Sequence, residues 1–203
     1  MDFGLWLVFL VASVGLALTP GPNGMLALTH GAMHGVRKTL GTISGGVLGF
    51  GLVIAMSMFG IGALLAASAQ LLIAMKWIGG AYLVYLGIQI WRSPAIGIDQ
   101  GKSQGSVKAI QLFRSGFLTA ITNPKAILFF VAFLPQFLDA NRNLGIQFLI
   151  LASTYMVVEF LYEFVVATLA DRIKPLLQRI GKGLNRVFGS VFVVIGIALP
   201  LRG

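Results

Sequence analysis

The stretch Thr122-Asn123-Pro124-Lys125 interrupts a long apolar segment with an amide, a proline and a charged side chain. A second stretch, Thr19-Pro20-Gly21-Pro22-Asn23, interrupts the first apolar segment in a similar way. Proline lacks a backbone N–H and clashes with the preceding turn, which costs about 3 kcal/mol or more inside a helix. In lipid no water satisfies the freed carbonyl groups, so each break must face protein or a polar cavity. The two breaks therefore predict a binding site within the membrane, as in transporters with discontinuous helices.

The composition is typical of integral membrane proteins. Of the 203 residues, 57% are hydrophobic and 10% are charged, and the mean hydropathy is +0.91. Soluble domains carry about 25% charged residues. The chain has no cysteine, which excludes disulfides, thiolate metal sites and thiol redox chemistry. Because Met1-Asp2 supplies no basic segment before the first apolar stretch, we expect a retained span there and not a signal peptide.

Hydropathy predicts an all-α membrane protein with six spans of about 20 residues each. Their predicted ranges are 3–35, 40–67, 70–91, 113–138, 144–170 and 187–199. The first range would make a straight helix of roughly 50 Å, which is too long for a hydrocarbon core of about 30 Å, so a break at Pro20 to Asn23 is needed. Between the last two spans, residues 171–186 place apolar side chains at helical spacing among basic ones. This pattern predicts an amphipathic helix on the membrane surface.

The distribution of lysine and arginine predicts the orientation. Eleven of the 15 basic residues lie in the segments that join spans one to two, three to four and five to six. Three, namely Lys76, Arg142 and Arg202, lie toward the opposite side of the membrane, and the last is Lys125. Because short cytoplasmic loops are enriched in Lys and Arg, we expect both termini in the periplasm. The net charge of +9 is then a topology signal, and we do not expect nucleic-acid binding.

The halves of the chain resemble each other weakly, which predicts a single domain made of two inverted three-span repeats. Ala17 to Pro20 resembles Ala120 to Pro124, and a pair of glycines spaced by seven recurs in spans three and six, as Gly80 with Gly87 and Gly189 with Gly196. Inverted repeats with paired broken helices are a transporter architecture, in which one repeat rocks against the other. The predicted parts of domain 1–203 are a first repeat 1–91, a cytoplasmic linker 92–112 and a second repeat 113–203.

The residues at each break favour the start of a new half-helix. Asparagine is a preferred N-cap and proline a favoured first helical residue, so Asn123-Pro124 should begin one half-helix and Pro20 to Asn23 another. A helix N-terminus carries about half a positive charge and exposed N–H groups, and Lys125 adds a full charge. Together these groups are suited to bind a carboxylate. The alternatives are a lysine that extends to the lipid headgroups or forms a structural pair.

Span five supplies the opposite charge. Glu159 and Glu163 are four residues apart and share one helix face, near Tyr155 and Tyr162. A charged side chain at the bilayer centre costs about 2.5–3.5 kcal/mol or more, which marks it as a functional candidate. We expect these glutamates to bind a substrate ammonium group or to carry a coupling proton. The alternative is that they only neutralise Lys125.

A site for a carboxylate beside a site for an ammonium group has the charge pattern of a free amino acid. The predicted substrate-binding residues are Thr19, Pro20, Gly21, Pro22, Asn23, Asn123, Pro124, Lys125 and Tyr155. The sequence shows no hydrolase triad, phosphate loop or zinc motif, so we expect neither an enzyme nor a cofactor. His30 and His34 alone do not predict a metal site.

Three glycines spaced by four in span two, Gly41, Gly45 and Gly49, form a small-residue face that allows close helix approach. We expect this face to pack within the chain, with a homodimer interface as the alternative.

The segments 18–23, 80–87 and 122–126 resemble the corresponding motifs of the LysE/RhtB family of bacterial amino-acid exporters, and the resemblance extends over nearly the whole chain. It implies a six-span carrier of the bacterial inner membrane that exports amino acids or close derivatives, driven by the proton motive force. Members commonly carry an acidic residue in span five, which Glu159 matches, whereas Glu163 has no such match. The substrates implied are small amino acids such as homoserine, threonine or leucine. The rival interpretations are an exporter of metal or other cations and a membrane scaffold without transport.

Overall fold

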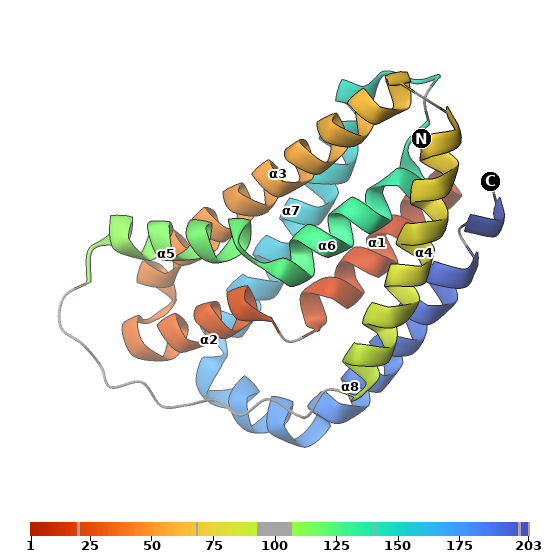
Figure 1. Cartoon of the computed structure of the whole chain (residues 1–203). Helices are drawn as coiled ribbons and strands as arrows, with labels where there is room; N and C mark the ends of the chain where they lie inside the picture. Colours follow the sequence, from red (N-terminus) through yellow and green to blue (C-terminus); the bar gives the residue numbers. More distant parts are fainter. Residues whose placement is uncertain (20, 68, 93–106, 140, 199, 203) are drawn as a thin grey trace.

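The structure is a computed structural model of the chain, and it describes residues 1–19, 21–67, 69–92, 107–139, 141–198 and 200–202. Over these residues the chain forms eight α-helices and two short 3-10 helices without any β-strand (Figure 1). This confirms the prediction of an all-α protein. Pro20 and most of the predicted linker lie outside the described residues.

The first and fourth predicted spans are each divided into two helices. The first comprises α1 (Phe3–Leu18) and α2 (Pro22–His34), whose axes are bent by 54° at the break. The fourth comprises α5 (Ala109–Ile121) and α6 (Pro124–Phe133), and α6 continues into the 3-10 helix η1 (Leu134–Phe137). The bend of 49° lies at the break between α5 and this second segment. The prediction that spans one and four are broken near their prolines is therefore confirmed for the described residues, since neither segment is a straight helix.

The remaining helices are longer. They are α3 (Val36–Ala67), α4 (Ala69–Arg92), α7 (Leu144–Thr168) and α8 (Ala170–Ala198), followed by the 3-10 helix η2 (Pro200–Arg202). By length and composition of the described residues, α3 and α7 can each cross a membrane, and the two bent pairs raise the number of candidate spans to four.

Two predicted boundaries are wrong. Residues 171–186 are helical, as predicted, but they are not separate from the sixth predicted span, because both belong to the single helix α8. The helical spacing of apolar residues runs on through Arg186, and no residue there ends the helix. The fourth span also begins earlier than predicted, because α5 starts at Ala109, next to the N-cap residue Lys108.

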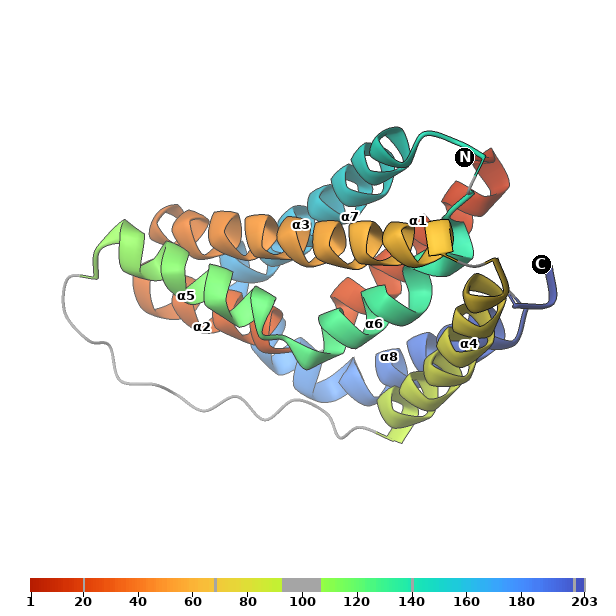
Figure 2. The same cartoon turned by 45° about the horizontal axis from the view of Figure 1, so that its top comes forward.

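Helices α3 and α5 lie side by side, and their contact is made by glycines (Figure 2). A methyl group at Gly45 would overlap the carbonyl oxygen of Phe113, and one at Gly116 would overlap that of Thr42. At Gly41 and Gly49 an added Cβ would lie 3.0 Å and 2.9 Å from carbonyl oxygens of α5. The small-residue face of span two is therefore covered within the chain, as expected.

Helices α4 and α8 form the second close pair (Figure 2). Gly80 faces Gly196, and an added Cβ on either would lie 2.6 Å from the carbonyl oxygen of the other. Gly87 faces Gly189 with corresponding distances of 2.6 Å and 2.5 Å. The two glycine pairs noted in the sequence thus pack directly against each other.

The core is built around α6, with aromatic side chains from α1, α6 and α8. The Phe129 and Phe133 ring centroids are 4.4 Å apart, and Phe9 and Phe192 close the cluster from two sides. Large apolar side chains remain exposed on the outside, for example Met56 at 69% and Ile78 at 70%. This distribution suits a protein whose outer surface contacts lipid.

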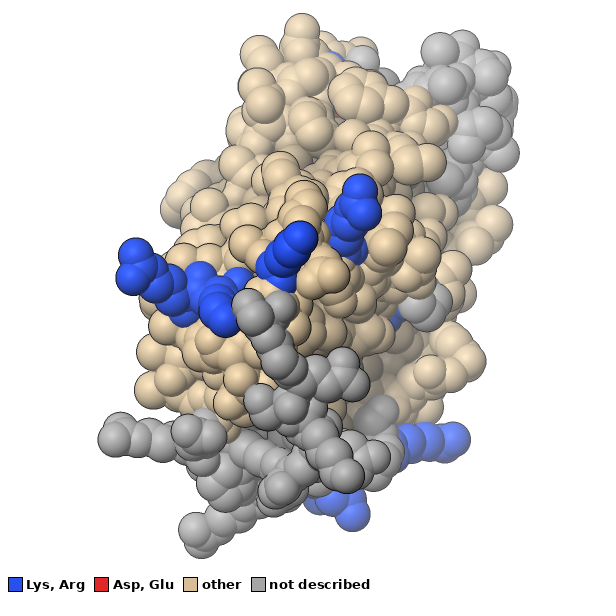
Figure 3. All heavy atoms as spheres, turned by 90° about the vertical axis from the view of Figure 1, so that its left-hand side faces the viewer, with Lys and Arg blue, Asp and Glu red and all other residues tan. Residues whose placement is uncertain are grey.

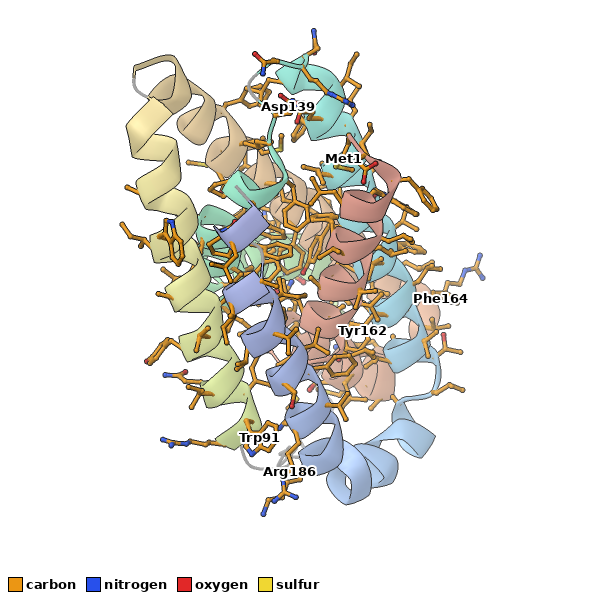
Figure 4. The ribbon with its side chains drawn as sticks, turned by 90° about the vertical axis from the view of Figure 1, so that its right-hand side faces the viewer. Met1, Trp91, Asp139, Tyr162, Phe164 and Arg186 are labelled. Carbon is orange, nitrogen blue, oxygen red and sulfur yellow. The ribbon has the colours of Figure 1, made fainter. Side chains whose placement is uncertain are left out.

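The two ends of the helix assembly differ in charge. Met1 and Asp139 lie at one end, whereas Trp91 and Arg186 lie at the other (Figure 4). Several Lys and Arg side chains, and no Asp or Glu, are visible on the face of Figure 3. Exposed basic residues near the start of α3 and in the first turns of α5 are Arg37, Lys38, Lys108 and Arg114.

Candidate functional site

The first break ends α1 without a regular continuation. Thr19 caps the helix, and its backbone N–H and its hydroxyl both donate to the carbonyl of Gly15, at 3.0 Å and 2.7 Å. Helix α2 then begins at Pro22 with Gly21 as its N-cap, which has no side chain to cap the first turn. Threonine hydroxyls that bond the carbonyl four residues back often bend helices.

The second break uses the same threonine contact and adds a cap. The hydroxyl of Thr122 donates to the carbonyl of Leu118 at 2.7 Å. The side-chain oxygen of Asn123 accepts hydrogen bonds from the backbone N–H groups of Lys125, at 3.1 Å, and Ala126, at 3.4 Å. This confirms the predicted start of a half-helix with an asparagine N-cap before proline.

The two breaks meet in the interior. The side-chain amide of Asn123 donates to the side-chain oxygen of Asn23 at 3.4 Å, although the residues are 100 positions apart. Both side chains are only 3% exposed. A buried amide pair of this kind requires both partners, because an unpaired amide in an apolar environment costs several kcal/mol, about 2–7 depending on the reference.

Lys125 points inward and binds the end of α1. Its ammonium group donates to the carbonyl oxygens of Leu16, at 3.1 Å, and Thr19, at 2.8 Å. An added Cβ at Gly21 would lie 2.8 Å from the lysine nitrogen, so the glycine leaves space for this group. The lysine is therefore placed at the electronegative carbonyl end of a helix, a contact that the sequence did not predict.

The two glutamates lie on the buried face of α7. Glu159 is 4% and Glu163 is 1% exposed, and the hydroxyl of Tyr155 donates to Glu159 at 3.1 Å. The side-chain amide of Asn23 interacts with the Glu163 carboxylate, although among the described residues no donor meets regular hydrogen-bond distance and angle at either oxygen. The glutamate lies beside Gly46 on α3, where an added Cβ would be 3.4 Å from Glu163 and 2.9 Å from the amide nitrogen of Asn23.

Tyr162, from the same helix, points into the assembly, while Phe164 points away from it (Figure 4). A Cβ added at Gly24 of α2 would lie 2.7 Å from the Tyr162 hydroxyl oxygen. The inner face of α7 therefore contacts the first turn of α2 through a polar side chain.

A small cavity lies where the breaks and α7 meet. Its volume is about 10 Å³, room for about one water molecule. The predicted site residues that line it are Thr19, Gly21, Asn23, Asn123, Lys125, Tyr155 and Glu159. Glu163, Pro22 and Pro124 are not among the lining residues, and Pro20 lies outside the described residues.

The sequence interpretation missed Ala17, Gly24, Phe50 and Ala126, which also line the cavity. Gly24 and Ala126 are adjacent to predicted residues, so the helix breaks could have indicated them. Phe50 lies on α3 and its ring packs against Tyr155, with centroids 5.4 Å apart. One apolar residue in an apolar helix carries no signal that could have identified it.

The two histidines form a local contact outside this cavity. His30 bonds the hydroxyl of Thr42 at 2.7 Å, and the His30 and His34 rings are 5.6 Å apart. In the described part of the chain no three side chains of the types His, Cys, Asp or Glu come together as metal ligands.

Comparison with known proteins places these features in a family. The model of the family described as LysE type translocator matches residues 14–203. A homoserine/homoserine lactone efflux protein of Salmonella typhimurium is 35% identical over 201 residues, which cover 98% of this chain and 97% of the relative. A leucine efflux protein of Klebsiella pneumoniae is 30% identical, with coverage of 95% and 93%. An uncharacterized membrane protein of Vibrio cholerae is 36% identical, with coverage of 98% for both chains. No solved structure matches the chain.

Proposed function

Because this chain belongs to the LysE type translocator family, we propose that it exports small L-amino acids or close derivatives across the bacterial inner membrane, coupled to protons. The named efflux functions of the Salmonella and Klebsiella relatives support substrates of the size and neutral charge of homoserine and leucine. The family consists of translocators, which supports transport and not catalysis as the function.

The observation that carries this proposal is a cavity with groups of both charges between two broken helices. The Lys125 ammonium and the N-terminus of α2 are positive, and the Glu159 carboxylate and the carbonyl end of α1 are negative. Charged groups at such depth are costly and are kept for function. A zwitterionic amino acid would complement both signs.

The size of the cavity supports a transport cycle with a large motion. A volume of about 10 Å³ has no room for an amino acid, so the described conformation cannot hold the substrate in this cavity. We propose that the two breaks separate to admit substrate, since half-helices that meet end to end can move apart at a break.

We propose that the six spans form two inverted repeats, as the sequence predicts. A two-fold axis that exchanges the repeats would convert the Gly80–Gly196 contact into the Gly189–Gly87 contact, and these contacts have nearly equal distances. The matching hydrogen bonds of Thr19 and Thr122 also support this symmetry.

The glycine contacts join one repeat to the other, however, so rigid rocking of whole repeats would break them. We therefore propose that α3 moves with α5, and α4 with α8.

For the orientation, we propose that both termini are periplasmic. The exposed basic residues near the starts of α3 and α5 (Figure 3) support a cytoplasmic location for that end. The position of Met1 and Asp139 away from Trp91 and Arg186 (Figure 4) supports loops that alternate between the two sides.

For the coupling ion, we propose that the carboxylates of α7 exchange protons during transport. Glu159 and Glu163 are four residues apart and buried, so their negative charges repel across a poorly screened space. Protonation of either glutamate removes that repulsion, which supports a change of conformation linked to a proton.

The proposal is tested by measuring flux from proteoliposomes loaded with labelled L-homoserine or L-leucine under an imposed proton gradient. We expect gradient-dependent exit of at least one amino acid, and none from vesicles without protein. In cells, overexpression should raise tolerance to a toxic amino-acid analogue. If overexpression instead raised tolerance to toxic metal ions, the protein would be a cation exporter. If it changed neither tolerance, the protein would be a membrane scaffold without transport.

Tyr155→Phe is expected to lower export roughly tenfold without loss of folded protein. The variant removes the hydrogen bond to Glu159, and hydrogen bonds to charged groups are worth about 1.5–3 kcal/mol, or about tenfold or more in a rate or binding constant. Tyr82→Phe, which removes a hydroxyl on α4 away from the cavity, is the matched control. Initial rates in proteoliposomes test this, and equal rates for both variants would show that the contact plays no part in transport.

A further inference from the structure

The carbonyl end of α1 is satisfied by a side chain from the opposite half of the chain. In a helix the carbonyl of Leu16 would accept the N–H of residue 20, and residue 20 is a proline without that donor. The ammonium of Lys125 takes this place at 3.1 Å and also bonds the Thr19 carbonyl at 2.8 Å. One ammonium group therefore replaces the donors that the break removes.

The second break needs no such help. There the freed carbonyl of Ala120 accepts the backbone N–H of Asn123 at 3.2 Å, and the Asn123 side chain caps α6. The difference is chemically informative. The first break leaves its carbonyl groups to the ammonium of Lys125, and Thr19 and Lys125 line the cavity together with Glu159.

Two carbonyl oxygens at a helix C-terminus, next to a carboxylate, form a binding site for a primary ammonium group. The helix end carries about half a negative charge, and the carbonyl groups accept directed N–H bonds. Both described bonds to Lys125 are of ordinary hydrogen-bond length. The site thus already holds a group of the chemical class that an amino acid carries.

We propose that the carbonyls of Leu16 and Thr19, with Glu159, are the subsite for the α-ammonium group of the substrate, and that Lys125 occupies it as a tethered substitute. This inference rests on the proposed function for the identity of the substrate. When an amino acid enters, its ammonium replaces that of Lys125 and keeps both hydrogen bonds. The released lysine is then free to pair with the substrate carboxylate, the role that the sequence suggested for it.

The exchange explains a glycine at position 21. A side chain there would come within 2.8 Å of the lysine nitrogen and 3.1 Å of the adjacent Cε. The backbone φ of Gly21 is −155°, which any residue can adopt, so conformation does not require glycine. A larger residue would instead force the flexible end of Lys125 to shift away from its position at the carbonyl groups.

The experiment asks whether a free primary ammonium can replace the tethered one. Lys125→Ala protein is purified in detergent, and its melting temperature is measured with ethylammonium chloride or with tetramethylammonium chloride, which has the same charge but no N–H donors. We expect ethylammonium to raise the melting temperature of Lys125→Ala by several degrees, as a ligand of the folded state does. Tetramethylammonium should not, and neither salt should distinguish wild type from the matched variant Lys108→Ala.

A second variant keeps the test decisive. Gly21→Ala combined with Lys125→Ala places a methyl group 2.8 Å from the position of the ammonium nitrogen, closer than van der Waals contact, so this double variant should weaken or lose the ethylammonium effect. Because Lys125→Ala alone can fail to fold, it is also extracted in the presence of each salt. Recovery that depends on ethylammonium supports the subsite. Equal effects of the two salts, or no recovery with either, would overturn it.

These measurements need no transport. An ethylammonium effect without amino-acid export would refute the proposed function and leave the ammonium site standing. Normal export by wild type without an ethylammonium effect on Lys125→Ala would refute the ammonium subsite and leave the proposed function standing. L-Leucine, but not its 2-hydroxy acid analogue, should also stabilise Lys125→Ala, which connects the subsite to an amino acid.

Discussion

Glu159→Gln is expected to abolish export driven by a pH gradient. The change keeps the size of the side chain and its contact with Tyr155, but it removes the negative charge that lines the cavity opposite Lys125. Glutamine cannot exchange a proton or attract an ammonium group by charge, and hydrogen bonds to charged groups are worth about 1.5–3 kcal/mol, so we expect a loss on the order of 10- to 100-fold in initial rate. The measurement is flux of labelled L-leucine from proteoliposomes with an imposed pH difference.

Two further variants complete this test. Asp139→Asn is the matched control, because Asp139 is a partly exposed acid that pairs with Arg142 at 3.1 Å and does not line the cavity. It should transport as wild type does. Glu163→Gln tests the other glutamate in the same way. If one of the two variants still exchanges internal for external substrate but its flux no longer responds to the pH gradient, the glutamate replaced in that variant carries the proton. Normal gradient-driven flux in Glu159→Gln would refute its role in the site.

Gly45→Ala is expected to cause the largest loss of folded protein of any single methyl addition on α3. The new Cβ would overlap the carbonyl oxygen of Phe113, and backbone cannot rotate away as a side chain can. The flanking contacts at Gly41 and Gly49 hold the two helices at this distance. Overpacking of this kind costs about 1–3 kcal/mol, occasionally more, and 3 kcal/mol would lower the melting temperature by roughly 6–12 °C.

Gly60→Ala provides a control in the same helix. An added Cβ at Gly60 would meet no atom within 4 Å, and alanine is favoured over glycine in helices by about 1 kcal/mol. This variant should melt at or above the wild-type temperature in the same detergent. If Gly45→Ala also melted at the wild-type temperature, α3 and α5 would not approach as closely as described.

Much of the helix order followed from local chemistry. The positions of both breaks, the asparagine cap of α6 and the burial of Glu159 and Glu163 were predicted because proline, N-cap residues and intramembrane charges act within a few residues of themselves. The boundary between the surface helix and span six was predicted wrongly, because helical periodicity alone does not show where a continuous helix turns from one environment to another.

The partners of polar groups could not be predicted in this way. Lys125 was expected to face a carboxylate, yet its ammonium binds the carbonyls of Leu16 and Thr19. Phe50 carried no mark that distinguished it from other apolar residues of α3, and it lines the cavity only because α3 passes beside Tyr155.

The amino-acid order alone settles where the backbone must lack donors, because a proline has no N–H in any fold, and it settles that two such places lie among apolar residues. It does not settle which group supplies the missing donor. That depends on the placement of α6 against α1, which brings residues more than 100 positions apart within hydrogen-bond distance, and a hydrogen bond forms only within about 3 Å.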